Sequence, residues 1–398
     1  MNPATHADDT DDFQAITINH LGKITIMDTA TITTATATPF PSWPILGQER
    51  GVALLQGAIM RGGVAHAYLF AGPTHSGRGT LARLFAQTLN CETPAADGSA
   101  PLAPCGLCRS CRKITRGTHP DVRIVGLASQ IAAGPAQGRR ETKNTSLSIV
   151  TVRSLIADLS LRPMEGRWLV AIVEDAEMMQ DAAADAFLKT LEEPPSYVVI
   201  IMIVPEVAAL KPTIRSRCQI VETRPVARET LATALAAQHG TSAADARTLA
   251  ALSRGRAGWA IAAAGQPDFF AERKGSFEAM LGLLQGPAFE FFPLVDRLTD
   301  RFRKGKRDEV YAELDTWLGL WRDLLLIRGG CAEFVLNIDY TDQLRPLAAR
   351  FTLAWLREAA SATTDAMRQL DENVAPRLAL ETLVLRWQEQ SLVVGRGS

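Results

Sequence analysis

The sequence has almost no net charge, lacks a long apolar run and contains few cysteines. Its 42 Lys and Arg residues balance 43 Asp and Glu residues, which leaves a formal net charge of −1 on 398 residues. A protein that coats nucleic acid by bulk electrostatics usually has a marked basic excess, so this class is disfavoured. Any contact with DNA is therefore expected to be local, or to be made by an assembly.

Segments that would span a membrane or direct secretion are also missing. The longest apolar run, residues 198–204, is far shorter than the roughly 20 residues that a membrane-spanning helix needs. The first 20 residues contain four aspartates and no apolar stretch after a basic start, unlike a secretory signal. Six cysteines in a chain of this length do not form a disulfide framework. We therefore expect a cytoplasmic protein that is not associated with a membrane.

The sequence does have enough apolar residues for a substantial core. Hydrophobic residues make up 47%, which excludes a mainly disordered chain and, at roughly 100–200 residues per domain, suggests two or three domains. Residues 1–41 are predicted to be a disordered tail, because Thr29–Pro39 alternates Thr and Ala and offers little to bury. Folded structure is expected from residue 42.

Strands and helices are predicted to alternate over residues 42–222. The runs 66–71, 168–173 and 198–204 are almost continuously apolar, which is typical of strands covered on both faces. A helical pattern over 81–89 follows the first run, and another over 184–191 stops at two prolines. This alternation favours an α/β fold with a parallel, doubly wound sheet. We expect residues 126–147, which are mostly small and polar, to form a surface insertion.

From residue 223 onward the patterns are helical. A short pair of helices is predicted over 230–239 and 243–252, and a longer helical region runs from about residue 277 to the end. Trp317 and Trp321, four residues apart, are expected to lie in a seam between packed helices.

A glycine-rich loop lies between the first predicted strand and its helix. Its spacing is close to the phosphate-binding pattern G-x-x-x-x-G-K-[ST], with Gly72 and Gly77 at the glycine positions. Arg78 stands at the lysine position and Gly79 at the position of the hydroxyl that binds magnesium. Arginine does not simply replace the compact ammonium, and glycine offers no magnesium ligand. The alternative is a glycine turn with no relation to nucleotide binding.

The run 168–173 ends on Glu174 and Asp175, which resembles the acidic strand end of a nucleotide hydrolase. If Asp175 is the residue that supports magnesium, the next position holds Ala176 instead of a glutamate that orients water. With the changes in the loop, this predicts poor or absent ATP hydrolysis. Whether nucleotide binds without being hydrolysed is left open.

Four cysteines cluster after the helix that follows the loop. Cys105, Cys108 and Cys111 form a C-x₂-C-x₂-C pattern, and Cys91 lies upstream. Four thiolates can close a tetrahedral zinc site with no open position, which predicts a structural role for the metal. The alternatives are free buried thiols, or a redox or iron–sulfur site. Cys91 is the ligand that this spacing specifies least.

Further motifs follow in order along the chain: His119-Pro120-Asp121, Glu165-Gly166, Leu188-Lys189-Thr190-Leu191-Glu192-Glu193-Pro194-Pro195, Thr213-Ile214-Arg215-Ser216-Arg217-Cys218 and Glu372-Asn373-Val374-Ala375-Pro376-Arg377-Leu378-Ala379-Leu380-Glu381. With the loop and the cysteines, this order resembles the AAA+ clamp-loader subunits of bacterial DNA polymerase III. The likeness is strong over about residues 44–260 and resumes in the last motif. The losses in the loop and at the strand end are similar to those of the delta-prime branch of this family, and differ from the active gamma/tau branch.

This resemblance implies a RecA-like AAA+ domain over 42–222 with a zinc-binding insert at about 91–111. It implies a small helical lid over 223–272 and an all-helical collar, which oligomerises, over 273–398. Gly258 would stand where active members have an arginine in the lid.

The resemblance also implies a role and partners. The chain would be a non-hydrolysing clamp-loader subunit that works with gamma/tau and delta subunits. Through the assembly it would act on the sliding clamp and primed DNA. Arg217 would be an arginine finger that reaches the ATP site of a neighbouring subunit, where a guanidinium stabilises the transferring phosphoryl group. Two alternatives remain at this point: an active gamma/tau-type ATPase, and a zinc-dependent nucleic-acid-binding module.

Overall fold

The computed structural model describes residues 15–18, 24–27, 41–95, 97–132, 146–286, 288–372 and 374–389, and the chain divides into two units, 1–41 and 42–398. In the first unit, β1 (Ala15–Ile18) pairs antiparallel with β2 (Ile24–Met27), two strands that the sequence did not predict. The rest of the expected disordered tail, apart from Pro41, lies outside the described residues.

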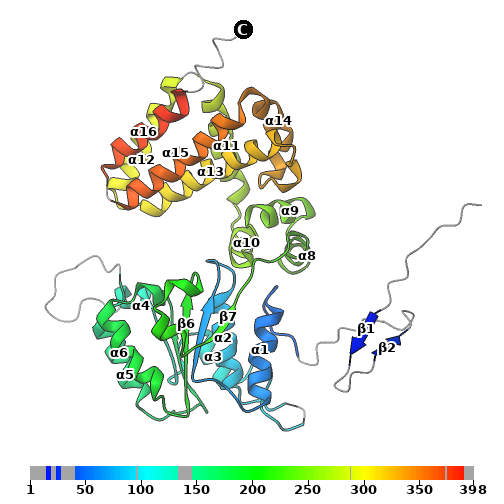
Figure 1. Cartoon of the computed structure of the whole chain (residues 1–398), viewed down its shortest axis with the longest axis vertical. Helices are drawn as coiled ribbons and strands as arrows, with labels where there is room; N and C mark the ends of the chain where they lie inside the picture. Colours follow the sequence, from blue (N-terminus) through cyan, green and yellow to red (C-terminus); the bar gives the residue numbers. More distant parts are fainter. Residues whose placement is uncertain are drawn as a thin grey trace, which may run out of the picture. The chain divides into compact units, whose positions relative to one another are not determined.

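The second unit begins with a five-stranded sheet in the order β4-β5-β6-β3-β7, in which every pair is parallel (Figure 1). The strands are β3 (Ala67–Ala71), β4 (Val122–Val125), β5 (Leu169–Val173), β6 (Val198–Val204) and β7 (Gln219–Glu222). Every residue of β3, β5 and β6 is buried, as expected of continuous apolar runs in the middle of a parallel sheet. The α/β class and the parallel sheet are therefore confirmed.

Helices cover both faces of this sheet. They are α1 (Glu49–Met60), α2 (Arg78–Leu89), α3 (Arg109–Thr115), α4 (Leu127–Ala132), α5 (Ile149–Leu159), α6 (Asp181–Glu192) and α7 (Pro212–Arg215). Alternate residues of one strand serve the two layers, because successive side chains of a strand point to opposite faces. Tyr68 and Phe70 of β3 pack into the core of α1 and α2, whereas Leu69 packs into the core of α5 and α6.

Helix α6 agrees with its prediction. Ala184, Phe187 and Leu191 are buried on one face, and the helix ends just before Pro194. Of the expected surface insertion at 126–147, the structure shows α4 and residues 146–147, while residues 133–145 lie outside the described part.

A group of three helices follows the sheet: α8 (Arg228–His239), α9 (Ala243–Leu252) and α10 (Ala257–Ala264). They share a small core with Leu231, Leu235 and Leu249 at its centre. Because this core is separate from those of the sheet, the group packs as its own layer.

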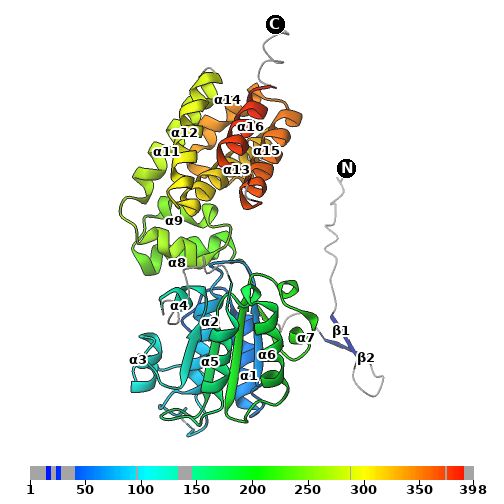
Figure 2. The same cartoon turned by 90° about the vertical axis from the view of Figure 1, so that its left-hand side faces the viewer.

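The C-terminal domain is helical (Figure 2). Its helices are α11 (Phe269–Gln285), α12 (Phe292–Arg303), α13 (Arg307–Arg328), α14 (Thr341–Arg350), α15 (Leu353–Asp371) and α16 (Pro376–Glu389). Trp317 and Trp321 of α13 are fully buried and contact Trp387 of α16, with ring centroids 4.8 and 5.3 Å apart. This confirms the helix–helix seam predicted from their spacing.

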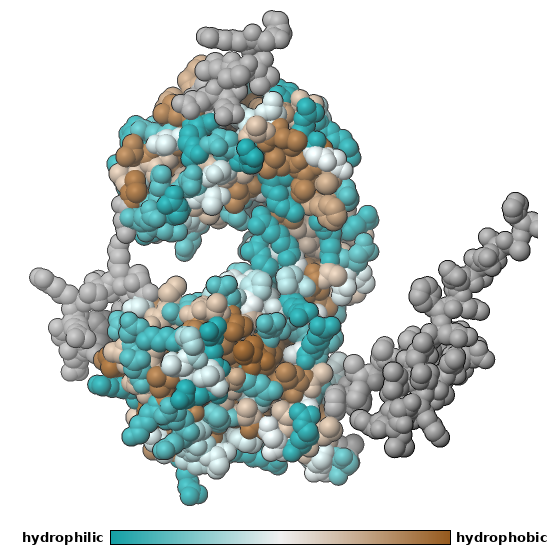
Figure 3. Space-filling model, in the orientation of Figure 1, coloured by the Kyte–Doolittle hydropathy of each residue, from teal (hydrophilic) through white to brown (hydrophobic). Residues whose placement is uncertain are grey.

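The surface shows no apolar band in the view of Figure 3, where hydrophobic residues form separate patches among hydrophilic ones. Of the helices in the described residues, none is long and apolar enough to cross a membrane.

Candidate functional site

The backbone of the glycine-rich loop requires its two glycines. The loop runs from the end of β3 to α2, and Gly72 has a φ of 150°. A Cβ on Gly72 would lie 2.2 Å from Thr223 Oγ1 and 2.5 Å from the Thr223 carbonyl oxygen, which leaves no room for a side chain. Gly77 caps α2 with a φ of 100°, a conformation that side chains disfavour. The loop thus has the strand–loop–helix setting of a phosphate-binding loop.

A pocket of about 290 Å³ opens beside this loop. It brings together three of the residues proposed from the sequence: Gly77, Arg78 and Asp175. Gly72 lies in the same loop but does not line the pocket. The volume is just below the roughly 300–1,000 Å³ that is typical of small-molecule sites.

Arg78 and Glu177 place opposite charges in the pocket wall. Arg78 Nη1 and Glu177 Oε2 are both buried, and neither has a hydrogen-bond partner among the described residues. Burial lowers the pKa of Arg78 and raises the pKa of Glu177, while the attraction between the two groups opposes both shifts. Arg78 thus stands where the pattern has a lysine, facing acidic side chains of the chain itself.

Asp175 serves a local structural purpose. It follows the end of β5 by two residues in a left-handed conformation with φ 52°, and its Oδ2 accepts a hydrogen bond from Leu127 N at 3.2 Å. This contact joins the end of β5 to the start of α4.

Arg83 is a pocket residue that the sequence reasoning missed, and its partner Glu174 was named there only as part of the acidic strand end. Arg83 Nη2 donates to Glu174 Oε1 at 2.8 Å. A Cβ on Gly79 would lie 3.4 Å from Arg83 Nη1 and 3.8 Å from Glu174 Oε1. The ion pair therefore lies within van der Waals distance of the place where a side chain at position 79 would begin. No spacing rule pairs a charge at a strand end with one that lies 91 residues earlier, so the sequence offered no signal for this pair.

The lid position proposed from the sequence also faces the loop. Gly258 N donates to the His75 carbonyl oxygen at 2.9 Å, and Gly258 lines the pocket. The nearby Arg254 points elsewhere, since its Nη2 lies 3.8 Å from the Cβ position of Gly319 in α13. The position at the pocket is thus occupied by a residue with no side chain.

Arg217 lies outside this pocket, after the short helix α7. Its Nη1 donates to the Thr213 carbonyl oxygen at 2.7 Å and its Nη2 to Glu192 Oε1 at 2.6 Å. About a third of the side chain, 35%, is exposed. The structure therefore brings Arg217 to the end of α6 and not to the loop of its own chain.

The four clustered cysteines converge. The sulfur atoms of Cys91, Cys105, Cys108 and Cys111 all lie within 4.8 Å of one another and could hold a metal ion. Backbone N–H groups point at the sulfurs: Cys108 N lies 3.2 Å from Cys105 Sγ, and Cys111 N lies 3.3 Å from Cys108 Sγ. Burial raises the pKa of Cys105, but hydrogen bonds to its sulfur outweigh burial and lower this pKa to about 6. Four converging sulfurs, two of which accept backbone N–H bonds, form a set that fits a thiolate-bound metal.

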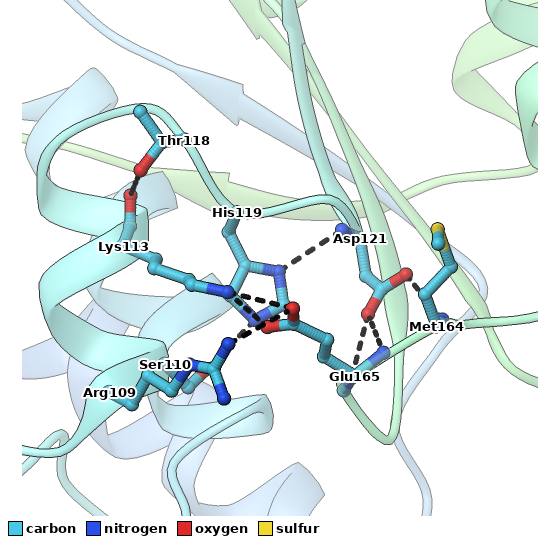
Figure 4. A network of polar contacts seen from close by, with 9 residues as sticks. Arg109, Ser110, Lys113, Thr118, His119, Asp121, Met164 and Glu165 are labelled. Carbon is cyan, nitrogen blue, oxygen red and sulfur yellow. Dashed lines mark hydrogen bonds and ion pairs between the residues drawn. The ribbon is translucent and has the colours of Figure 1, made fainter.

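A polar network fastens the cysteine-bearing helix α3 to the sheet (Figure 4). The buried Asp121 accepts backbone N–H bonds from Met164, Glu165 and Gly166 at 2.6–2.8 Å. His119 Nδ1 accepts from Asp121 N at 3.1 Å, so its Nε2 is the nitrogen that donates to Ser110 Oγ at 3.0 Å. The motifs at 119–121 and 165–166 thus have a structural role that their sequence did not reveal.

Ion pairs complete this network on the surface of α3. Glu165 contacts Lys113 at 2.5 Å and Arg109 at 3.6 Å. Burial lowers the pKa of His119, which keeps its ring neutral near pH 7 and able to accept through one nitrogen.

A parallel sheet with a glycine-rich loop after β3, followed by a helical group and a helical C-terminal domain, defines a RecA-like AAA+ protein. Two family models match the chain: "DNA polymerase III, delta subunit" over residues 47–227, and "DNA polymerase III, delta subunit, C terminal" over residues 302–389. The chain belongs to the clamp-loader subunits of bacterial DNA polymerase III.

Curated relatives agree with this assignment. The chain is 27% identical to DNA polymerase III subunit delta' of Bacillus subtilis over 343 residues, which covers 86% of this chain and 96% of the relative. It is 33% identical to subunit tau of Escherichia coli over 174 residues, or 44% of this chain, but spans only 24% of the length of tau. The delta' match thus extends over both the sheet-containing part and the helical C-terminal part of the chain, whereas the tau match covers less than half of the chain.

Solved structures that align with the chain include a DNA polymerase III gamma-subunit-related protein of Thermotoga maritima, at 19% identity with a TM-score of 0.38. That alignment covers 85% of this chain and 99% of the other. The DNA clamp loader delta protein of Bacillus subtilis aligns at 11% identity with a TM-score of 0.32, over 84% of this chain and 99% of the other.

Proposed function

We propose that this protein is a non-hydrolysing, delta-prime-like subunit of the clamp loader. It helps to load the sliding clamp on primed DNA as part of an assembly with gamma/tau and delta subunits. Residues 42–222 form the AAA+ domain, 223–272 the lid and 273–398 a collar through which the subunits associate. Support comes from the delta' relative, which this chain matches over 96% of that relative's length.

The observation that carries the non-hydrolysing role is the surroundings of Gly79. Position 79 has no hydroxyl. Beside it lies the ion pair of Arg83 and Glu174, whose charged atoms are 2.8 Å apart. Magnesium in such a loop needs that hydroxyl as a ligand, and a guanidinium next to it repels a dication. Gly258 likewise offers no side chain to a nucleotide from the lid. The pocket thus lacks two groups that would help to hold Mg·ATP, a hydroxyl at position 79 and a lid side chain at position 258.

Arg217 is proposed to act at the ATP site of a neighbouring subunit, and not at the pocket of its own chain. Its guanidinium is partly exposed and lies outside the pocket of this chain. A guanidinium supplied by a neighbour can stabilise the negative charge that develops on a transferring phosphoryl group. A chain that does not hydrolyse ATP itself can therefore still contribute to ATP hydrolysis by its neighbour.

The four cysteines are proposed to hold one structural zinc ion. Cys91, Cys105, Cys108 and Cys111 supply all four ligands, so no position remains for a reacting water. When bound, the metal joins the start of the insert at Cys91 to helix α3.

Reconstituting the clamp loader from its separate subunits, with and without this chain, tests the function. The isolated chain is expected to hydrolyse no ATP and to co-purify with the other subunits. Arg217→Ala is expected to lower the DNA-stimulated turnover of the assembly at least about ten-fold. Arg224→Ala removes another exposed guanidinium, which lies beside Glu222 of β7, and serves as the control.

Two results would contradict the proposal. Mg·ATP turnover by the isolated chain would support an active gamma/tau-type ATPase instead. Unchanged turnover of an assembly that contains Arg217→Ala would remove the arginine-finger role.

A further inference from the structure

The guanidinium of Arg217 is held on two sides. Nη2 donates to Glu192 Oε1 at 2.6 Å, and Nη1 donates to the Thr213 carbonyl oxygen at 2.7 Å. The Thr213 contact is local in the chain, but Glu192 lies 25 residues away. The tertiary fold therefore sets the direction of this side chain.

The carboxylate of Glu192 lies at an electrostatically unfavourable end of its own helix. It is the last residue of α6, which cannot continue through Pro194 and Pro195. The C-terminal end of a helix has a partial negative charge, so a carboxylate there is disfavoured. The cation of Arg217 compensates for this, which makes the pair more favourable than a carboxylate alone.

A second ion pair ties the same segment to the other end of α6. Lys211 Nζ lies 2.8 Å from Asp181 and 3.3 Å from Asp185. Helices α6 and α7 lie side by side between these two ties (Figure 2). The tie at Lys211 holds the backbone of the segment, whereas the tie at Glu192 holds the guanidinium itself.

We propose that Glu192 is a positioning residue that orients Arg217 toward the phosphate-bearing ligand of the neighbouring subunit. This inference rests on the arginine-finger role proposed above. A free arginine side chain has many rotamers, and fixing its planar guanidinium in advance reduces the freedom lost when the contact forms. The carboxylate gives a charge-assisted hydrogen bond, which a glutamine of the same shape cannot match.

The test measures DNA-stimulated ATP hydrolysis by the reconstituted assembly, with kcat and the KM for ATP determined separately. Glu192→Gln is expected to lower kcat about three- to ten-fold and to leave KM unchanged, because positioning acts after nucleotide has bound. Glu193→Gln makes the same chemical change one residue later, at the end of α6, and is expected to behave as the unmodified protein. Glu192→Asp keeps the charge on a shorter side chain and should retain more turnover than Glu192→Gln.

A double variant separates positioning from a merely structural effect. If Glu192 acts through Arg217, Glu192→Gln has no further effect on kcat in the Arg217→Ala background. An equal loss in that background, or an unchanged or raised kcat for Glu192→Gln alone, would overturn the inference while the arginine finger stands. If Arg217→Ala itself has no effect, both the finger and its positioning fall. Co-elution of the subunits shows for each variant that the assembly has formed.

Discussion

Gly72 and Gly79 lie in the same loop, but only one of the two positions requires glycine for steric reasons. At Gly72 a Cβ would come within 2.2 Å of Thr223, so the backbone itself excludes a side chain. At Gly79 the closest atoms would lie at 3.4 and 3.8 Å, which is ordinary van der Waals contact. The fold demands glycine at the first position only. The missing hydroxyl at position 79 is therefore a chemical feature of the pocket.

Asp121 gives a prediction about stability at the scale of one residue. Burial raises the pKa of its carboxyl, but three backbone N–H bonds outweigh burial and hold the pKa below its usual value. Asp121→Asn replaces this charged acceptor and is expected to lower the free energy of unfolding by roughly 2 kcal/mol at pH 7. Chemical denaturation of both proteins measures this difference.

The sign of the pH dependence follows from the lowered pKa. A group whose pKa is lower in the folded state stabilises the fold fully above its unfolded pKa, about 3.9 for aspartate, and loses this effect as pH falls through the folded pKa. The difference between the protein and Asp121→Asn should thus be constant near neutrality and shrink below about pH 4. Asp158→Asn, which removes an exposed ion pair with Arg123, is the control and should cost less than about 1 kcal/mol. A difference that grows toward low pH would contradict this account.

At the scale of elements, strands in the middle of the sheet and strands at its edges differ in how well the sequence predicts them. The runs predicted as strands became β3, β5 and β6, which are buried on both faces. The edge strands β4 and β7 were not predicted. Three of the four residues of β7 are exposed, so no apolar run marks it, and only pairing with β3 makes it a strand.

Helix α3 is a short element, seven residues long, that we expect to depend on a metal. Isolated helices of this length are not stable in water, so its order must come from contacts and ligands. We predict about one zinc ion per purified chain, and loss of the zinc together with faster hydrogen exchange in α3 for Cys111→Ser. Elemental analysis and exchange mass spectrometry provide the two measurements.

Cys331→Ser is the matched control, because Cys331 lies in the C-terminal domain away from the cluster. It should retain the metal and the exchange pattern. Metal-free protein whose α3 exchanges as slowly as before would mean that the polar network of Asp121 and His119 holds the helix alone.

At the scale of the whole second unit, the loop that follows α13 contacts α8 of the three-helix group. Arg228 of α8 donates to the carbonyl oxygens of Glu333 and Val335 at 3.4 and 3.1 Å. The fully buried Asp323 of α13 holds the same loop by accepting from Leu336 N at 3.0 Å and Asn337 N at 2.8 Å. The loop that α8 contacts is thus held by a buried carboxylate.

We predict that Asp323→Asn destabilises the protein by roughly 3 kcal/mol, because backbone donors would lose a charged acceptor where water cannot reach. Exchange should rise over residues 331–340 and at the start of α8. Denaturation and exchange mass spectrometry measure these effects.

Asp308→Asn, an exposed substitution in the first turn of the same helix, should leave both measurements unchanged. If Asp323→Asn is destabilised but exchange at α8 is not affected, the loop does not couple the two helical parts.

The candidate site divides in a similar way between what could and could not be predicted. Loop spacing proposed Gly77 and Arg78, the acidic strand end proposed Asp175, and the structure brings the three together at one pocket. Arg83 and its pairing with Glu174 were missed, because two opposite charges 91 residues apart carry no pattern until the fold places them 2.8 Å apart. The partner of Arg217 was missed for the same reason.

The sequence alone determined the features that depend on local order along the chain. Apolar runs specified the central strands, glycine and proline specified the loop and the end of α6, and cysteine spacing specified the cluster. Only the tertiary structure decided which charges meet: Arg83 with Glu174, Arg217 with Glu192, and Asp323 with the loop beyond α13. The physical reason is that burial of apolar side chains follows a local period, whereas an ion pair requires that two distant segments approach within a few ångströms.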